Sequence, residues 1–283
     1  MQNKNYVIRT MTRDEINIAV EWAALEGWNP GLYDADCFYA ADPNGFLIGL
    51  VDGEPIAVIS VIKYDSNFGF LGFYIIKPEY RRMGYGIKIW NAGLKYLQGC
   101  NIGLDGVVAQ QDNYKKSGFN LAYRNIRFEG ISRRLSEKLP DVFELSSVPF
   151  QKIEEYDKRF FPAARNNFLK RWLNQPESKS FGVLTNGKLK GYGMIRVCRN
   201  GYKIGPLFAD TPEIAENIFL TLSANVNAGQ PLFLDTPETN PNAVNLAKKY
   251  DMKIVFETAR MYTGEFPDIS LERLYGVTTF ELG

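Results

Sequence analysis

The chain has 283 residues, of which 45% are hydrophobic and 23% are charged, a composition typical of a protein that folds along its whole length. Its 33 basic residues nearly balance its 32 acidic residues, so the net charge gives no general attraction to nucleic acid or to an anionic membrane. The sequence has no histidine, which excludes the commonest general base, the commonest zinc ligand and every nucleophile activated by an imidazole.

The cysteines and the N-terminal segment bear on the cellular compartment. Cys37, Cys100 and Cys198 are odd in number and far apart, without the paired spacing of metal ligands, so we expect a reducing compartment and no metal site. Residues Met1 to Thr12 lack the apolar core of a signal peptide, and no apolar run approaches the length needed to span a bilayer. These features predict a cytoplasmic protein.

The first half begins with a strand and a helix, followed by further strands. The pattern predicts a strand at Tyr6 to Thr10, and Thr12 with Glu15 forms a capping box that starts the helix. Two strands are predicted within Phe46 to Ile62 and a third at Phe68 to Ile76. Because polar turns connect these strands directly, we expect them to pair antiparallel.

A strand, helix, strand crossover follows, and then the sequence becomes rich in turns. The predicted elements are a helix at about Gly84 to Leu97, a strand at Ile102 to Val108, a short helix at Asn113 to Lys116 and a strand at Leu121 to Phe128. The stretch Ser132 to Pro149 is mixed and turn-rich, which is typical of a domain boundary.

The second half repeats this order more loosely. Aligning Asp105 to Arg127 with Asp235 to Arg260 places Gly118 on Asp251, Tyr123 on Phe256 and Arg127 on Arg260, which indicates a duplicated domain. We therefore predict a first domain at 1–131, a linker at 132–149 and a second domain at 150–283. The predicted elements of the second half are a helix near Asn166 to Leu173, a hairpin around Asn186 and Gly187, a helix at Pro212 to Asn225, a strand at Leu232 to Asp235 and a helix at Asn242 to Tyr250.

A glycine-containing loop lies between the third strand and the following helix. Gly84 and Gly86 let the backbone curl, so that amides and the helix N-terminus can point at a phosphate-rich ligand, and Arg81 and Arg82 add positive charge there. The alternative is an ordinary strand-to-helix turn with solvated arginines. The loop lacks the Gly-Lys-Ser or Gly-Lys-Thr of a Walker loop and the third glycine of a dinucleotide fingerprint.

The order Arg81, Gly84, Gly86 after a strand that ends in Lys-Pro resembles the acetyl-CoA motif of the GNAT (Gcn5-related N-acetyltransferase) superfamily. The resemblance implies an α/β fold of the α+β type, a tandem GNAT fold in which each domain is a mixed, mostly antiparallel sheet flanked by helices. It also implies that the loop amides bind the pyrophosphate and that the strand before the loop pairs with the pantetheine arm. The implied cofactor-binding residues are Tyr74, Ile75, Ile76, Arg81, Arg82, Met83, Gly84, Tyr85, Gly86, Asn113 and Lys116.

A second match lies downstream, where Tyr114 is followed by Gly118 and Phe119 and resembles the Tyr-x-x-x-Gly-Phe element of the superfamily. The resemblance implies that Tyr114 lies near the cofactor sulfur and protonates the leaving thiolate as general acid. The alternative is an aromatic side chain that only packs helix against sheet.

The resemblance also places an acceptor pocket in the loop after the first helix. Either a base or a water chain must remove a proton from the amine, and without histidine carboxylates are the candidate bases. Glu26 in this loop is the first candidate, although a glutamate near a helix end is more often a solvated or capping residue. Trp28, Asn29 and Tyr33 are the expected acceptor-binding residues. Asp105 is a weaker candidate base, because Asp235 occupies its repeat position and suggests a structural role for both.

The second half lacks the features that would bind coenzyme A. Ala247 stands at the position of Tyr114, and the junction Gly205 to Asp210 has neither an arginine nor paired glycines, so this half resembles a degenerate acetyltransferase-like domain. It could cover one side of the acceptor cleft or only stabilise the first domain. Asp235 and Glu238 are possible contacts for a cationic acceptor.

Together these features predict an acetyl-CoA-dependent N-acetyltransferase that acts on the primary amine of a small molecule. The alternative is a binding module that senses acyl-CoA without turnover, but the presence of Tyr114 favours catalysis. We expect no metal, no nucleic-acid partner and no membrane partner, and a monomer or homodimer.

Overall fold

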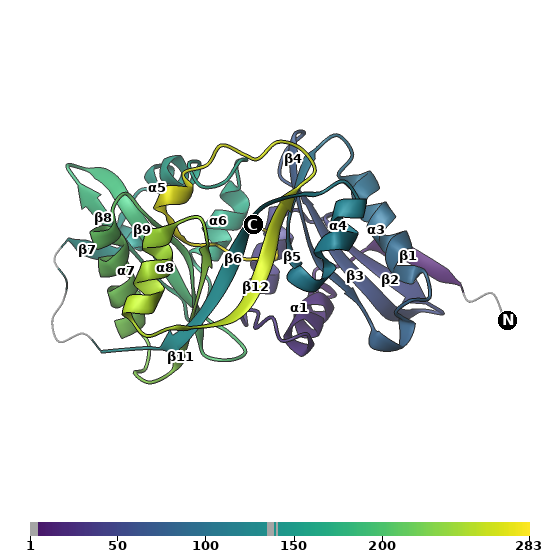
Figure 1. The fold of residues 1–283 in the computed structure, drawn as a ribbon, viewed down its shortest axis with the longest axis horizontal. Helices are drawn as coiled ribbons and strands as arrows, with labels where there is room; N and C mark the ends of the chain where they lie inside the picture. Colours follow the sequence, from purple (N-terminus) through teal and green to yellow (C-terminus); the bar gives the residue numbers. More distant parts are fainter. Residues whose placement is uncertain (1–4, 135–138, 140) are drawn as a thin grey trace.

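A computed structural model describes residues 5–134, 139 and 141–283 (Figure 1). Residues 135–138 and 140 of the predicted linker 132–149, and the first four residues of the N-terminal segment, lie outside the described part. Within the described part, no helix is both long enough and apolar enough to cross a membrane.

The first half contains the predicted elements and one additional helix. The capping box is present, since the Thr12 amide donates to the Glu15 carboxylate at 2.8 Å and the Glu15 amide donates to the Thr12 hydroxyl at 3.4 Å. The sequence analysis missed the helix α2. The elements are β1 (Tyr6–Thr10), α1 (Ile16–Leu25), α2 (Asp34–Ala41), β2 (Phe46–Val51), β3 (Glu54–Lys63), β4 (Phe68–Ile76), α3 (Tyr85–Tyr96), β5 (Asn101–Val107), α4 (Gln111–Lys116) and β6 (Asn120–Ile131).

The second half follows the predicted order, with five elements in addition: β7, α5, β10, β12 and β13. The elements are β7 (Val142–Glu144), α5 (Phe150–Asp157), α6 (Asn166–Trp172), β8 (Lys179–Thr185), β9 (Lys188–Val197), β10 (Tyr202–Ala209), α7 (Pro212–Ala224), β11 (Pro231–Pro237), α8 (Pro241–Lys249), β12 (Lys253–Tyr262) and β13 (Leu274–Gly276).

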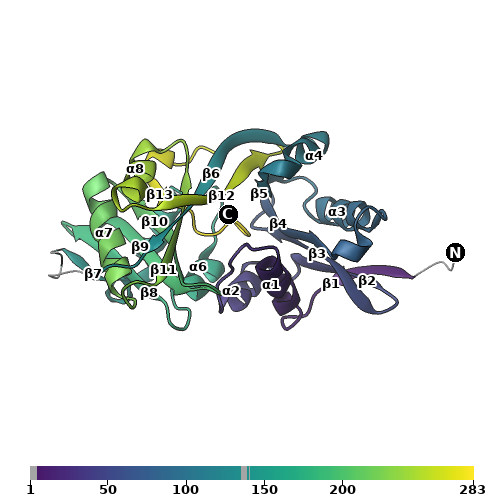
Figure 2. The same cartoon turned by 60° about the horizontal axis from the view of Figure 1, so that its bottom comes forward.

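Two strands are exchanged between the halves, which joins all the strands into one sheet (Figure 2). The sheet order is β1-β2-β3-β4-β5-β12-β6-β11-β10-β9-β8-β7, with β13 paired to β10. Strand β12 of the second half therefore lies between β5 and β6, and β6 of the first half lies between β12 and β11. The mixed, mostly antiparallel architecture is confirmed, and the sheet runs through both halves.

The paired strands β6 and β12 are related by a pseudo-twofold axis. Asn125 pairs with Thr258, and the repeat alignment also makes these two residues equivalent. The pairing is symmetric on either side of them, because each strand carries one bulge, at Ala122 in β6 and at Val255 in β12. The sequence repeat is therefore a structural repeat whose axis passes between the exchanged strands.

Two buried ion pairs join the halves across the exchanged strands. Arg260 donates to Asp105 at 2.9 and 2.6 Å, and Arg127 donates to Asp235 at 2.7 and 2.8 Å. The aspartates are repeat equivalents, as are the arginines, so each half supplies the acid of one pair and the base of the other. Because these side chains are almost fully buried, removing one partner would cost about 3–5 kcal/mol.

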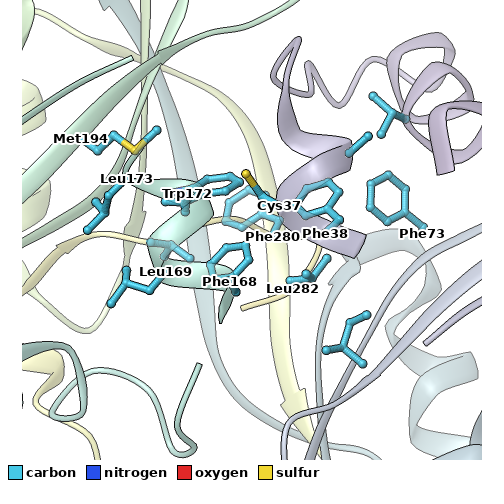
Figure 3. Packing of buried hydrophobic residues seen from close by; sticks show 14 of the residues in the cluster. Cys37, Phe38, Phe73, Phe168, Leu169, Trp172, Leu173, Met194, Phe280 and Leu282 are labelled. Atoms are coloured by element: carbon cyan, nitrogen blue, oxygen red, sulfur yellow. The ribbon is translucent and has the colours of Figure 1, made fainter. Parts of the chain in front are cut away.

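A hydrophobic core on one face of the sheet also spans both halves (Figure 3). Helices α1 and α2 of the first half contribute to it together with α5 and α6 of the second. The ring of Phe38 on α2 lies 6.1 Å from Trp172 on α6 and 5.5 Å from Phe73 on β4. Phe280 and Leu282 of the C-terminal tail complete this core. Helix α3 packs on the opposite face of the first half, against a separate core.

We expect that neither half folds alone. A chain ending at Ile131 would leave one edge of β5 and both edges of β6 unpaired, and it would expose the core that α2 shares with α6. Residues 1–131 expressed alone should show no cooperative thermal transition by circular dichroism, whereas co-expression with 132–283 should restore a complex. A fragment 1–131 that is monomeric and melts cooperatively would contradict this expectation.

Candidate active site

The strand β4 carries a bulge near its middle. Gly72 pairs with Ser60 and Ile75 pairs with Val58, so Phe73 and Tyr74 together oppose one residue of β3. Phe73 takes a positive φ of 46°, a conformation that a bulky side chain rarely adopts. The bulge bends the second half of β4 while keeping it paired to β3.

Beyond this bulge, β4 and β5 separate. The two strands are parallel, and their pairing ends at Leu71 and Leu104. From there β5 continues along β12, with Val107 opposite Thr258, whereas β4 follows β3. The edge of β4 at Tyr74 to Ile76 is thus left without its neighbouring strand, and an extended ligand can pair with it as an added strand would.

The loop after β4 ends in an uncapped helix N-terminus. Arg82 and Gly84 have positive φ values of 64° and 83°, and α3 begins directly afterwards at Tyr85. Since Gly84 occupies the capping position, no side chain there can accept bonds from the first-turn amides. A side chain at Gly86 would place its Cβ 2.6 Å from the hydroxyl of Tyr74, so glycine allows the helix to approach β4. The free amides lie beside the open edge of β4.

In the second half, the helix equivalent to α3 is capped and the strand edge equivalent to that of β4 is paired. Thr211 caps α7 by accepting a bond from the Ile214 amide at 3.4 Å, and Pro212 has no amide hydrogen to offer. Strand β13 pairs with β10 at Leu207 and Phe208, and so lies beside the edge that corresponds to the open edge of β4. This half therefore has neither the strand edge nor the helix end that the first half presents.

The arginines of the loop differ in their contacts. Arg81 donates to the Ile76 carbonyl at 2.8 Å and forms an ion pair with Glu26, so it connects the end of α1 to the end of β4. Its side chain remains 46% exposed. Arg82 and Met83 are exposed next to it.

Tyr114 lies where β5 departs from β4. Its ring covers Gly106, where a side chain would collide with it, and stacks on Trp90 of α3 at 5.9 Å. Tyr74 contacts the same tryptophan at 5.0 Å. Burial and, to a lesser degree, the Tyr74 phenol raise the pKa of Tyr114 to about 12, so the phenol keeps its proton throughout the neutral range.

Asn113, Lys116 and Tyr85 are also predicted to bind the cofactor. Asn113 donates to the side chain of Gln110 at 2.7 Å, and Lys116 is exposed at the end of α4. The Tyr85 ring packs against Tyr6 at 4.8 Å.

The loop after α1 is held by the exchanged strand β6 and by the second half. The Trp28 carbonyl accepts from Arg127 on β6 at 2.6 Å, and the Asn29 carbonyl accepts from Lys203 of the second half at 2.8 Å. The Asn29 amide group also bonds the backbone of Asn200, accepting at 2.8 Å and donating at 3.0 Å. The second half therefore fixes the conformation of the loop in which the sequence placed the acceptor pocket.

A cavity of about 370 Å³ lies beneath this loop and between the halves. Its charged groups have different environments: Arg127 is neutralised by Asp235, Arg199 pairs with Glu21 at 2.6 Å, and Glu129 has no hydrogen bond or ion pair among the described side chains. The lining residues are Ala24, Gly27, Asn29, Arg127, Glu129, Arg199, Asn200, Phe233, Val255 and Phe256.

Of the predicted acceptor contacts, Asn29 is the one that lines this cavity. Tyr33 donates to Glu177 at 2.6 Å instead, and Trp28 contributes its backbone. Asp235 is buried against Arg127, and Glu238 accepts from the Arg124 amide at 2.9 Å. The second-half residues that line the cavity belong to no sequence motif. Only the tertiary arrangement of the two halves brings them to the cavity, so the sequence could not predict them.

A bulged strand that parts from its parallel neighbour, beside an uncapped helix N-terminus, defines an acyl-CoA-binding transferase site. Residues 13–119 match the acetyltransferase (GNAT) family, and residues 153–276 match an acetyltransferase (GNAT) domain. The chain belongs to the GNAT superfamily of N-acyltransferases and carries the fold twice.

Individual relatives and solved structures match most or all of the chain. The chain is 28% identical to holothin acyltransferase of Pseudoalteromonas sp. (strain SANK 73390), over 100% of this chain and 96% of that protein. It is 24% identical to YitH of Bacillus subtilis (strain 168), an uncharacterized N-acetyltransferase, with 66% of each chain covered. A crystal structure from Pyrococcus horikoshii shares the fold, with a TM-score of 0.83 and 24% identity over 100% of this chain and 99% of that chain. A tandem GNAT protein from the clavulanic acid biosynthesis pathway gives a TM-score of 0.61 and 9% identity, over 93% of this chain and all of the other.

The close approach of α3 to β4 predicts a pair of compensating substitutions. Gly86→Ala should lower the free energy of unfolding by about 1–3 kcal/mol, because its Cβ would press on the Tyr74 hydroxyl. Tyr74→Phe removes that hydroxyl, so the double variant should recover most of the loss in chemical denaturation. Equal destabilisation of the single and double variants would show that the hydroxyl is not the obstacle.

Proposed function

We propose that this chain transfers the acetyl group of acetyl-CoA to the primary amine of a small molecule bound between its two halves. The observation that carries the proposal is the open edge of β4 at Tyr74 to Ile76, which lies beside the uncapped N-terminus of α3 and the buried phenol of Tyr114.

In this proposal the loop and the strand edge hold the co-substrate. The backbone of Tyr74 to Ile76 would pair with the pantetheine arm, and the amides of Arg82 to Gly86 would bind the pyrophosphate. Arg81 and Arg82 supply positive charge at the same place, and Asn113 and Lys116 at the rim of α4 would contact the cofactor from the other side. The ion pair with Glu26 would orient Arg81 toward the loop. We therefore assign Glu26, the carboxylate expected to act as base, a positioning role.

Tyr114 is the proposed general acid. Its phenol lies where the strands part, and its raised pKa keeps it protonated at every pH at which an amine acceptor would be used. A protonated phenol can donate a hydrogen bond to the thiolate as the carbon–sulfur bond breaks. It can then transfer its proton to the sulfur.

The cavity beneath the α1 loop is the proposed acceptor site, with Asn29 at its edge and the aromatic rings of Phe233 and Phe256 in its walls. A relative similar over the whole chain is a holothin acyltransferase, so a small-molecule amine, with holothin as the compound to test, is the acceptor we propose. The second half then has a direct role, since it lines the cavity and fixes the loop above it.

We expect one acetyl-CoA site per chain. Isothermal titration should give a stoichiometry of one, because the second half has a capped helix and an occupied strand edge. The variant Arg81→Ala/Gly84→Ala should bind at least 10-fold more weakly, since it loses a charge and strains a position with positive φ. The matched control Arg133→Ala/Gly53→Ala removes an exposed arginine and strains a remote positive-φ glycine, so its affinity should be unchanged. No binding by the intact protein would overturn the proposal.

Tyr114→Phe should lower kcat by about 10²–10⁴-fold while acetyl-CoA still binds, because the ring stays and only the acidic proton is lost. Thiol release from acetyl-CoA with holothin as the amine measures this. Since the Tyr114 pKa is raised to about 12 from 10, the acid form persists as pH rises, and the intact enzyme should show no loss of activity from this group between about pH 8 and 10. Full activity of Tyr114→Phe would remove the tyrosine from the mechanism. A chain that binds acetyl-CoA but releases no thiol would favour a sensing module.

A further inference from the structure

The tail that follows β13, residues 277–283, crosses the middle of the molecule and reaches the bulge of β4 (Figure 2). The Val277 amide donates to the Asp235 carbonyl at 2.8 Å, and Tyr64 donates to the Leu282 carbonyl at 2.9 Å. The carbonyl of Glu281 lies directly over Gly72, where any side chain would collide with it. The tail is therefore fixed at the point where β4 and β5 begin to part.

Glu281 on this tail is a buried carboxylate that lacks a basic partner. Its residue is only 4% exposed, and its side chain accepts a bond from the Thr279 hydroxyl within the same turn. Among the described residues, it forms no ion pair with any lysine or arginine. Removing a carboxylate from water without pairing it is costly, so such a group is retained where it does chemistry or binds a ligand.

The charged groups around Glu281 are already occupied. Arg127 on β6 is paired with Asp235, and Arg196 on β9 is paired with Asp34 of α2. Lys203 on β10 donates to the Asn29 carbonyl, and burial lowers its pKa. Arg127, Arg196 and Lys203 all interact electrostatically with Glu281 without contacting it. Its carboxylate therefore lies in a positive field but is not locked in a bidentate pair.

The tail also connects the strand edge with the cavity. The ring of Phe280 covers the Arg127 guanidinium at 4.9 Å, and Arg127 is one of the residues that line the proposed acceptor cavity. Glu281 follows Phe280, and its backbone carbonyl lies over Gly72, next to the β4 bulge. Its carboxylate interacts electrostatically with Arg127, so the tail carries Glu281 from the strand edge toward a residue of the cavity wall.

We propose that Glu281 is the general base that accepts a proton from the acceptor amine. This inference rests on the proposed function. As the nitrogen of a neutral primary amine forms its bond to the thioester carbon, Glu281 takes one N–H proton. As the carbon–sulfur bond breaks, Tyr114 gives its proton to the sulfur. The products are the amide and the free thiol, and the proton held by Glu281 returns to Tyr114 through solvent, so atoms and charge balance.

Glu281→Gln tests this assignment, because it keeps the shape of the side chain and removes its basicity. With acetyl-CoA and holothin, we expect kcat to fall about 10²-fold or more, while the KM for acetyl-CoA and its affinity by titration stay unchanged. A fall in kcat with unchanged acetyl-CoA affinity and unchanged thermal stability is a split between turnover and binding that a merely structural residue would not cause. Glu281→Asp keeps a carboxylate and should recover part of the lost rate.

Glu272→Gln is the matched control. Glu272 is 70% exposed shortly before β13 and should leave the rate and the pH profile unchanged. Full activity of Glu281→Gln with an unchanged pH profile would overturn the role of Glu281 while leaving the proposed function intact. If Glu281→Gln does not fold, Glu281→Asp decides, since a folded Glu281→Asp that binds acetyl-CoA with unchanged kcat and an unchanged KM for the amine would contradict the assignment. An intact chain that binds acetyl-CoA but does not acylate holothin would overturn the proposed acceptor, and with it the role of Glu281 toward that amine.

Discussion

The exchange of β6 and β12 is the constraint on which the rest of the structure depends. It places the Asp105–Arg260 and Asp235–Arg127 pairs across the boundary between the halves, so the halves cannot separate without breaking these two buried ion pairs, the Asp34–Arg196 pair and three strand pairings. The same exchange brings Arg127 under the α1 loop, where it holds the Trp28 carbonyl. One topological feature thus sets both the stability of the molecule and the shape of the cavity.

The two copies of the fold have diverged by opening one site and closing the other. In the first copy, a glycine starts α3 and the edge of β4 is free, whereas in the second a threonine and a proline start α7 and β13 pairs along β10. The chain after β13 then continues to the first copy, where Glu281 contacts the β4 bulge. The degenerate copy therefore contributes to the site of the first through its strand, its hairpin and its tail.

The two halves contribute different kinds of chemical groups. Backbone groups of the first half are suited to hold the acyl donor, because amides and a strand edge bind a flexible phosphate-bearing chain without needing particular side chains. Side chains from the second half line the cavity proposed for the acceptor, where selectivity requires specific shapes and charges. The hydrogen bonds of Asn29 with Asn200 and Lys203 hold the loop above this cavity in one conformation, which would favour a fixed orientation of a bound ligand.

Sequence alone determined the features that depend on local chemistry. The Thr12 and Glu15 capping box, the strand at Phe68 to Ile76, the glycine loop and the duplication could be predicted because each is written in neighbouring residues or in a repeat. Only the tertiary structure decided the strand exchange, the cavity lining and the position of Glu281, since these depend on contacts between residues far apart in the chain. An identical pattern of strands fits exchanged and unexchanged pairing equally well. The choice between them lies in packing and in the cross-paired Asp–Arg groups, whose partners no local pattern can identify.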